Sequence, residues 1–581
     1  MAKILKKMMV LLDGKQKRTM VLLVIMMFIG AILEAFSITM VVPVASIIIS
    51  PTAIQDNELV ASIYEFLPFE SEKTFGTAVM MALIAAFILK NIYIYFMQKA
   101  QYHFIYTNQF RTSEHMMKNY MRRGYEFFLN ADTAVVQRTI TSDVNNMYAL
   151  ILSVLQLISE VMVFIALSIV LLKEDPLMTI FLAVLLGITL LIIKVVLKPI
   201  MYKAGKDNQD YYSNLFKWIN QTVTGIKEVK VGGREKYFID TYRGYGKGYV
   251  DAVQKYTLYN NIPKLIIETV CVAGVVLYFL YIFLSGQSSE DVMAIITAFG
   301  LAVARLMPSA NRINNQLNNI AYFEPFFMRV SDNLQVDING ENTDISFMEV
   351  PKEKLSVTKE IVLEGVSYKY PNTDKWILKD ANVTIPVGQA VGIVGTTGAG
   401  KSTIVDVLLG MLVMQEGKIT ADGRDVFDKN NYRKWLKNIG YIPQNIFMLD
   451  DSIRKNVAFG IPDDEIDDNR VWEVLKEAQL DDFVRSLPEG LDSSVGERGI
   501  RVSGGQRQRL SIARALYEDP EVLIMDEATA ALDNDTEKAI MDSINLLHGS
   551  KTLIIIAHRL QTIEKCDAVY RIEDGKAVRE R

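Results

Sequence analysis

The chain has 581 residues, half of them apolar, and a formal net charge of -5 at pH 7. This length predicts at least two domains, and the nearly balanced charge excludes the broad basic surface that nucleic-acid binding requires. The two cysteines, Cys271 and Cys566, fall in unlike surroundings and are predicted to be unpaired thiols.

The N-terminal half is dominated by apolar stretches of membrane length. Residues 1–12 mix lysines with apolar residues, a pattern that predicts a helix lying along a membrane surface. Six later stretches are each long enough to cross a bilayer core of roughly 30 Å at about 1.5 Å per residue. The predicted spans are residues 19–50, 76–98, 146–172, 177–197, 261–284 and 291–312. The first span is too long for a signal peptide and lacks a convincing cleavage site.

Basic residues predict the orientation of these spans. They gather before span one, between spans two and three, and between spans four and five, and such segments face the cytoplasm. We therefore expect a multi-pass protein of the cell membrane with both termini cytoplasmic. Residues 332–354, rich in Asp, Asn, Glu and Lys, predict a linker between a transmembrane domain, 1–331, and a second domain, 355–581.

Four basic residues fall within or at the ends of the predicted spans: Lys90, Lys264, Arg305 and Arg312. Charge at such depth is unfavourable unless it faces a wet cavity or a partner. Cations in the inner half of the core would suit an anionic headgroup, with phosphate or pyrophosphate as the first candidate. The alternative is internal neutralisation by the carboxylates of Glu34, Glu160 and Glu268.

A glycine-rich loop lies between an apolar strand and an apolar helix in the second domain. It reads Gly395-Thr396-Thr397-Gly398-Ala399-Gly400-Lys401-Ser402-Thr403. Glycines let the backbone N–H groups of such a loop face phosphates, and the helix N-terminus adds a positive dipole end. We expect Lys401 to reach the β- and γ-phosphates and Ser402 to bind Mg²⁺. The alternative, a glycine-rich turn without a ligand, does not explain the order of strand, loop, Lys-Ser and helix.

A second apolar strand, residues 521–525, ends in two carboxylates. Asp526 there suits Mg²⁺, and Glu527 suits an attacking water that it would polarise. The alternative role for Glu527 is to cap the next helix.

Residues from about 355 to 581 resemble the nucleotide-binding domain of an ABC transporter. Besides the loop and the acidic strand end, they contain Val502-Ser503-Gly504-Gly505-Gln506. The resemblance implies an α/β P-loop domain behind an all-α six-helix transmembrane domain, with ATP and Mg²⁺ as cofactors. It also implies that Tyr370 stacks on adenine, Gln444 touches Mg²⁺, His558 contacts the γ-phosphate and Asp533 lies at the dimer seam.

The family also implies pairing of two chains. Ser503, Gly504, Gly505 and Gln506 would complete the ATP site of a partner subunit, and one copy of each motif predicts a homodimer. A heterodimer with a similar partner is the alternative. Two positions depart from the family pattern: Val502 replaces a leucine, and Ala530 replaces a serine.

The membrane half resembles its family less fully. Residues 305–312 and their surroundings are similar to bacterial flippases for lipid-linked oligosaccharides. Residues 125–128 and 225–230 resemble regions near exporter coupling helices, and the alternative for both segments is plain packing of cytoplasmic helices. This resemblance implies that Lys90, Lys264, Arg305 and Arg312 engage a pyrophosphate. The predicted function is ATP-driven movement of a polyprenyl-pyrophosphate glycan from the inner to the outer leaflet. The alternatives are a multidrug, phospholipid or lipid A exporter, and an ATPase that acts as a regulatory module without transport.

Overall fold

The computed structural model describes residues 2–39, 72–174, 176–284, 289–338, 351, 353–371, 373–526, 544, 547–557 and 563–581. The chain divides into two compact units. The helical unit comprises Met1–Tyr120 and Ala131–Asn342, and the α/β unit comprises Met121–Asn130 and Thr343–Arg581. A short segment of the N-terminal half therefore belongs to the α/β unit.

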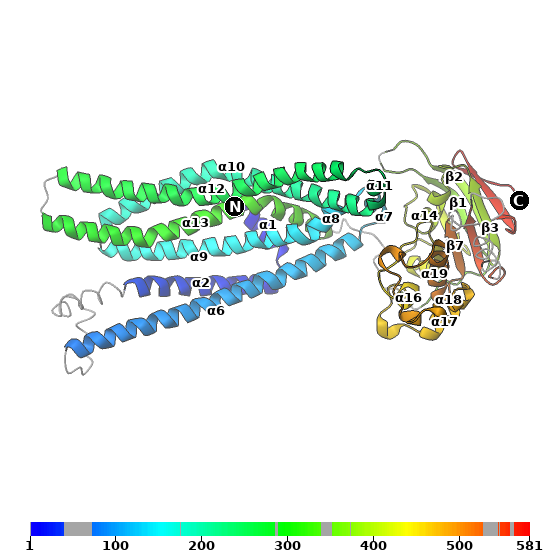
Figure 1. Ribbon diagram of the computed structural model, residues 1–581, viewed down its shortest axis with the longest axis horizontal. Coiled ribbons are helices and arrows are strands. Elements are labelled where there is room, and N and C mark those ends of the chain that lie inside the picture. Colours follow the sequence, from blue (N-terminus) through cyan, green and yellow to red (C-terminus); the bar gives the residue numbers. More distant parts are fainter. Residues whose placement is uncertain are drawn as a thin grey trace. The chain divides into compact units, whose positions relative to one another are not determined.

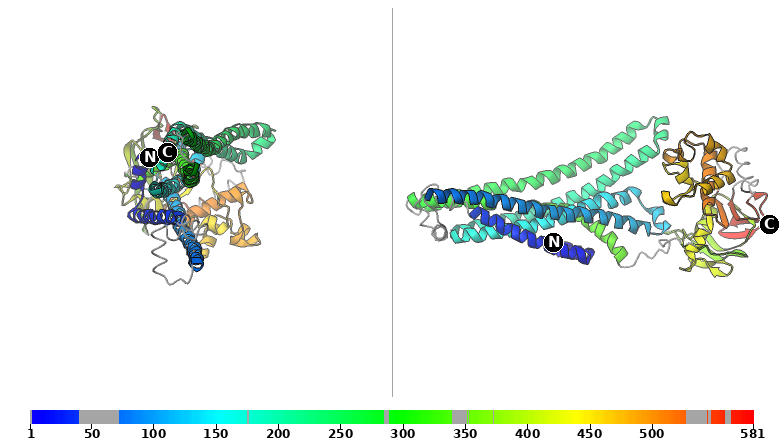
Figure 2. Two further views of the ribbon diagram at one scale, coloured as in Figure 1. Left: turned by 90° about the vertical axis from the view of Figure 1, so that its left-hand side faces the viewer. Right: turned by 90° about the horizontal axis from the view of Figure 1, so that it is seen from below.

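The helical unit consists mainly of long helices that run alongside one another (Figures 1 and 2). Helix α9 packs on α13 and on α2, and α10 packs on α12 and α13. At Gly205 of α10 a Cβ atom would lie 1.9 Å from the carbonyl oxygen of Tyr322 in α13, so this crossing requires glycine. The described helices are α1 (Ala2–Leu11), α2 (Gly14–Thr39), α6 (Glu72–Met121), α8 (Thr133–Arg138), the π-helix η1 (Thr139–Asp143), α9 (Val144–Glu174), α10 (Pro176–Thr224), α11 (Ile226–Val231), α12 (Glu235–Leu284) and α13 (Ser289–Ile338).

Several of these helices meet the requirements of membrane spans. By length and composition, five described stretches could cross a membrane: Gly14–Ser37, Thr74–Met121, Thr133–Leu172, Thr179–Thr224 and Glu235–Leu277. The predicted span 19–50 runs past α2 into residues that the structure does not describe, and the predicted span 291–312 falls within α13. Because α13 continues to Ile338, the first residues of the predicted linker are helical.

The α/β unit contains two sheets. A four-stranded sheet has the order β2-β1-β4-β5, and a six-stranded sheet has the order β10-β9-β3-β8-β7-β6. Neighbouring strands from β9 to β6 are parallel, and nearly every residue of β3, β7 and β8 is buried. The strands are β1 (Glu360–Tyr368), β2 (Leu378–Pro386), β3 (Ala390–Gly395), β4 (Glu416–Ala421), β5 (Arg424–Asp425), β6 (Ile439–Ile442), β7 (Val522–Asp526), β8 (Thr552–Ile556), β9 (Ala568–Glu573) and β10 (Lys576–Arg579).

Short helices surround these sheets. Helices α16, α17 and α18 gather beside α19 (Figure 1) and share its apolar core with one side of the six-stranded sheet. The described helices are α7 (Tyr125–Asn130), α14 (Lys401–Leu408), α15 (Tyr432–Lys437), α16 (Ile453–Val457), α17 (Asp468–Glu477), α18 (Asp481–Ser486) and α19 (Gly504–Tyr517). The predicted fold class, a helical transmembrane domain followed by an α/β domain, is confirmed.

Two local features bear on stability. The Asp422 carboxylate accepts hydrogen bonds from the backbone N–H groups of residues 358–360, at 2.8–3.1 Å, and so fixes the start of β1. Burial alone would raise the pKa of Asp422, but these donors lower it to about 2.

Cys271 and Cys566 are both buried and unpaired, as predicted, and burial raises the pKa of Cys566 to about 11.

Candidate nucleotide site

The parallel strands of the six-stranded sheet bring the predicted phosphate residues to one edge. Residue pairing places Ile393 of β3 and Asp526 of β7 beside the same residue of β8, Ile556. Because these strands are parallel, the loop after β3 and the acidic end of β7 leave the sheet on the same side. Gln444 follows β6 at this edge too, since Ile442 pairs with Met525. This edge is where open α/β sheets bind ligands.

The glycine-rich loop joins β3 to α14 and has the backbone that phosphate binding needs. Gly398 and Gly400 have φ angles of 82° and 105°, which glycine adopts without strain. A Cβ atom on Gly400 would lie 3.1 Å from Ile377 Cγ2, so a side chain there would also force its neighbours to move by a few tenths of an ångström. The backbone N–H groups at the start of α14 have no partner within the helix and can face an anion.

Lys401 and Ser402 begin α14 and carry the polar groups of the loop. The Lys401 side chain is buried, and its Nζ donates to the carbonyl oxygens of Gly395 and Thr396 at 3.2 and 3.3 Å. The Ser402 hydroxyl donates to Asp526 Oδ1 at 3.3 Å. Two residues predicted to share Mg²⁺ thus lie side by side. A hydroxyl and a carboxylate are hard oxygen donors and fit this ion, with water and phosphate filling the other positions.

A further carboxylate lies in α14, one turn beyond Ser402. Burial, together with the charge of Asp526, raises the pKa of Asp406 to about 6. Asp406 therefore adds a second, partly buried carboxyl group near Asp526, where a divalent cation would be bound. Asp406 was not among the predicted site residues, although its spacing from Ser402 on the helix is a signal that could have revealed it.

Tyr370 lies beside the phosphate loop. Its hydroxyl is 3.3 Å from Thr403 Oγ1, and its ring meets that of Tyr368 edge to face at 5.2 Å. A cavity of about 480 Å³ runs along the loop and is lined by Trp376 and Arg571, among other residues. Neither Trp376 nor Arg571 was predicted to line this cavity. Their positions beside the loop depend on the pairing of strands that are far apart in the sequence.

The Ser503-Gly504-Gly505-Gln506 segment forms the start of α19. The Ser503 hydroxyl caps the helix by accepting from the N–H of Gln506 at 3.2 Å, and Gln506 Oε1 accepts from the N–H of Ser503 at 2.7 Å. Val502, just before the cap, is buried and anchors the segment. Ser503 and Gly504 are exposed, so this helix end is open to a partner.

Four predicted positions lie outside the described residues: Glu527, Ala530, Asp533 and His558. Glu527 comes directly after β7, and His558 comes two residues after β8. Their catalytic and dimer-seam roles remain predictions.

Helix α7 belongs to the α/β unit and corresponds to one of the predicted coupling segments. Glu126 of α7 accepts hydrogen bonds from the Tyr368 hydroxyl at 2.9 Å and from the Val413 N–H at 3.3 Å. Tyr368 is fully buried at the end of β1. One carboxylate therefore joins α7 to two parts of the sheet domain. The segment was predicted from the sequence, but its contact through Glu126 was not.

The predicted substrate residues lie in different surroundings. Arg312 Nε is 2.7 Å from Glu160 Oε2, and Nη2 is 4.0 Å from Glu34 Oε1, so Arg312 is paired with the internal carboxylates considered above. Lys90 is half-buried, with its Nζ 4.7 Å from the Phe87 ring centre, whereas Lys264 is exposed. The Arg305 backbone lies in α13, and its side chain is outside the described part of the chain.

Comparisons with known proteins agree with this architecture. Residues 19–306 match the ABC transporter transmembrane region, and residues 378–530 match the ABC transporter family. The ATP-dependent lipid A-core flippase of Pseudomonas aeruginosa is 33% identical over 368 residues, which are 62% of this chain and 58% of that protein. The matched stretch thus spans less than two thirds of this relative.

Two further matches extend over more of the chain. An uncharacterized ABC transporter ATP-binding protein, y4gM of Sinorhizobium fredii, is 28% identical over 87% of this chain and 84% of its own length. A solved bacterial Atm1-family ABC exporter with ATP bound is 22% identical and shares the fold, with a TM-score of 0.76 over 97% of this chain and 95% of that one. The chain therefore belongs to the ABC transporter family, as a multi-pass membrane protein that carries its exporter-type transmembrane region and its ATPase domain in one polypeptide.

Proposed function

We propose that this protein is an ATP-driven flippase that moves a lipid-linked oligosaccharide, a polyprenyl-pyrophosphate glycan, from the inner to the outer leaflet of the cell membrane. The observation that carries the ATP-driven part is the 3.3 Å contact between Ser402 and Asp526 beside a loop built for phosphates. The exposed start of α19 supports the assignment, since its N–H groups and its Ser503 cap suit the phosphate of a nucleotide held by another copy.

The proposed active form is a homodimer with two equivalent ATP sites. In each site Lys401 would neutralise the phosphates, and Ser402, Asp526 and Gln444 would hold Mg²⁺, which would supply charge stabilisation during phosphoryl transfer. Glu527 orients the attacking water, and His558 contacts the γ-phosphate. Closure of the two ATPase domains on nucleotide then moves α7 and, through it, the transmembrane helices. The ATPase domain and both termini face the cytoplasm, in agreement with the basic loops of the sequence.

The proposed substrate follows from positive charge in the spans and from the flippase resemblance of residues 305–312. Lys90 and Lys264 have exposed or half-exposed side chains, which leaves them accessible to a pyrophosphate. Arg312 is held by Glu160, so it contributes only after that ion pair opens. We therefore assign the first contact with the headgroup to Lys90 and Lys264, and we add Arg305 on the flippase resemblance of residues 305–312 alone.

Transport by purified protein in proteoliposomes tests the proposal. A labelled polyprenyl-pyrophosphate glycan that faces the ATPase side should be lost from that leaflet only when ATP is added. Lys401→Ala should abolish this loss. Lys264→Gln should raise the lipid concentration needed for half-maximal transport, whereas Lys247→Gln, which changes another exposed lysine of α12, should not. Transport activity that does not depend on this lipid would exclude the lipid as the substrate.

The lipid A-core flippases among the relatives favour a second candidate, an exporter of lipid A-core or of a related lipid. The same vesicles can be loaded with lipid A, a phospholipid or a hydrophobic amine in place of the glycan. Stimulation of ATP hydrolysis by one of these compounds, with no response to the polyprenyl lipid, would support the second candidate. Lys264→Gln should then leave transport unchanged.

A further inference from the structure

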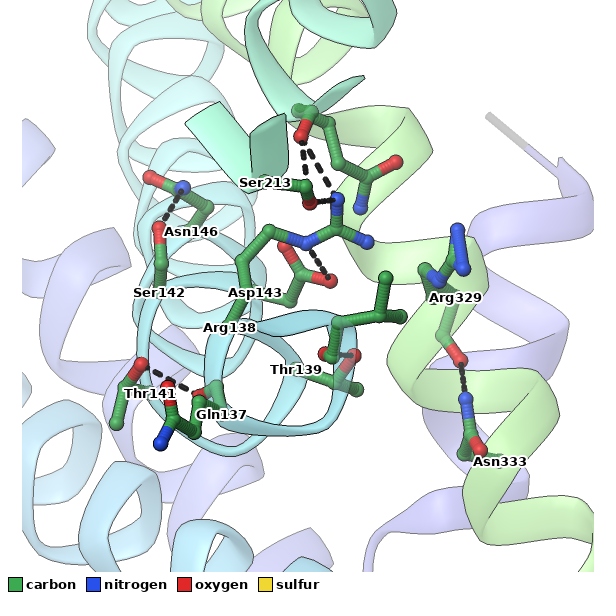
Figure 3. A network of polar contacts seen from close by, with 12 residues as sticks. Gln137, Arg138, Thr139, Thr141, Ser142, Asp143, Asn146, Ser213, Arg329 and Asn333 are labelled. Atoms are coloured by element: carbon green, nitrogen blue, oxygen red, sulfur yellow. Dashed lines mark hydrogen bonds and ion pairs between the residues drawn. The ribbon is translucent and has the colours of Figure 1, made fainter. Parts of the chain in front are cut away.

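A buried polar cluster occupies the helical unit just after the α7 segment. Arg138 ends α8, and Asp143 ends the π-helix η1; both side chains are almost wholly buried, at 3% and 0% exposure. Arg138 Nε donates to Asp143 Oδ2 at 3.2 Å (Figure 3). A charge buried this deeply is tolerated only when it is paired.

The π-helix explains why these two residues meet. They are five positions apart, which on an α-helix at about 100° per residue would turn them roughly 140° away from each other. A π-helix bonds residues five apart and therefore brings them onto one face. The ion pair and the π turn thus depend on each other. A return of this turn to α-helical geometry would separate Arg138 from Asp143.

The cluster also joins separate helices. Arg138 Nη1 donates to the Gln209 carbonyl oxygen of α10 at 2.7 Å and to the Ser213 hydroxyl. Arg329 of α13 lies beside the pair, as Figure 3 shows, and adds a second positive charge. The π turn is bonded to α6 as well, since the Ser113 hydroxyl donates to the Ile140 carbonyl oxygen at 2.7 Å.

Some polar atoms in this cluster are buried without a hydrogen-bond partner. They include Arg138 Nη2, whereas the Gln209 side chain lies within hydrogen-bonding reach of Asp143. Unsatisfied groups at such depth are unfavourable, so the observed arrangement does not use all the bonding that these side chains can offer.

The chain on either side of residues 121–130 is bonded within the helical unit. On one side, Asn119 of α6 donates to the Asn333 carbonyl oxygen of α13 at 2.7 Å. On the other, α8 starts at Thr133 and leads in six residues to Arg138. The chain that enters and leaves residues 121–130 therefore connects directly to α6 and α8 of the helical unit.

We infer that Arg138 and Asp143 are positioning residues that hold the π turn as a joint, through which movement of the α7 segment reaches α10 and α13. The inference rests on the proposed coupling of nucleotide hydrolysis to the membrane helices. The response of α10 to nucleotide requires an intact Arg138–Asp143 pair. ATP hydrolysis does not require this pair, because neither residue belongs to the ATP site.

Hydrogen exchange of the full-length protein in lipid nanodiscs tests this joint. Deuterium uptake is followed by mass spectrometry in peptides from residues 121–130 and from the cytoplasmic end of α10, with and without ATP and orthovanadate. We expect Asp143→Asn to keep ATP hydrolysis and the response of residues 121–130, and to reduce the response of α10 by about fivefold or more, the range of coupling between sites. Thr141→Ala, at an exposed residue of the same π turn, is the matched control.

Different outcomes separate this inference from the proposed function. An α10 response that is as large in Asp143→Asn as in the parent protein would contradict the role of the π turn as a joint. A parent protein in which neither peptide responds to nucleotide, although ATP is hydrolysed, would refute the proposed coupling and with it this inference. If Asp143→Asn does not accumulate in the membrane, Ser213→Ala removes only the hydroxyl that meets Arg138. It should weaken the α10 response in part, and an unchanged response would again overturn the joint.

Discussion

Replacement of Glu126 by alanine should loosen α7 from the ATPase domain by an amount that can be worked out from two hydrogen bonds. The bond from the buried Tyr368 hydroxyl is 2.9 Å long, and the bond from the Val413 N–H is 3.3 Å long. We assign about 1.5 kcal/mol to the shorter bond and about 1 kcal/mol to the longer one, since bonds to a carboxylate exceed neutral ones. Their sum, about 2.5 kcal/mol, corresponds to a change of about 60-fold in the local opening equilibrium.

Amide hydrogen exchange in peptides from residues 121–130 measures this opening directly. Glu126→Ala should accelerate exchange by about 60-fold, and Glu126→Gln, which keeps an acceptor oxygen, by about fivefold. Tyr368→Phe removes one donor and should fall between these values. Because the two residues act through one bond, the double variant Glu126→Ala with Tyr368→Phe should exchange no faster than Glu126→Ala alone. Unchanged exchange in Glu126→Ala, or additive effects in the double variant, would refute the reasoning.

Three further predictions concern other sites. Gly400→Ala should lower nucleotide affinity in a fluorescent-nucleotide titration more than Gly398→Ala does, because only the first Cβ meets neighbouring atoms in addition to an unfavourable φ. Asp422, with its pKa lowered to about 2, should contribute stability that is present above about pH 4 and lost as the pH falls through 2. In calorimetry, the unfolding temperature of Asp422→Asn should therefore fall less steeply at acid pH than that of the parent protein. Arg312→Gln should lower the unfolding temperature by leaving two carboxylates unpaired. Adding Glu160→Gln should recover part of the lost unfolding temperature, and a double variant with no such recovery would contradict the pairing.

Local sequence was sufficient to predict features that a few adjacent residues determine. The phosphate loop is one, because its glycines and the following Lys401 and Ser402 have fixed spacing between a strand and a helix. The start of α19 is another, since Ser503 and Gln506 form a capping box within four residues of chain. The long apolar stretches likewise indicated helices, because only hydrogen-bonded backbone is stable in a bilayer.

Contacts between distant residues could not be predicted in this way. Glu126 and Tyr368 are 242 positions apart, and nothing near either residue indicates the other. The pairing of Arg138 with Asp143 depends on a π turn, whereas a regular helix would have placed the two side chains on different faces. For Arg312 the sequence allowed two alternative partners, a bound substrate or internal carboxylates. Only the packing of α2, α9 and α13 shows that carboxylates are its neighbours.

The membership of α7 in the compact ATPase unit affects how this protein can be divided or recombined. A fragment that begins at residue 343 lacks α7 and leaves the Tyr368 hydroxyl without the acceptor it has in the whole chain. Such a fragment should be less soluble and less stable than its length suggests, because a buried donor without a partner is unfavourable. Chimaeras that exchange ATPase domains between relatives should therefore carry residues 121–130 together with their own Tyr368, so that both ends of the contact come from the same parent.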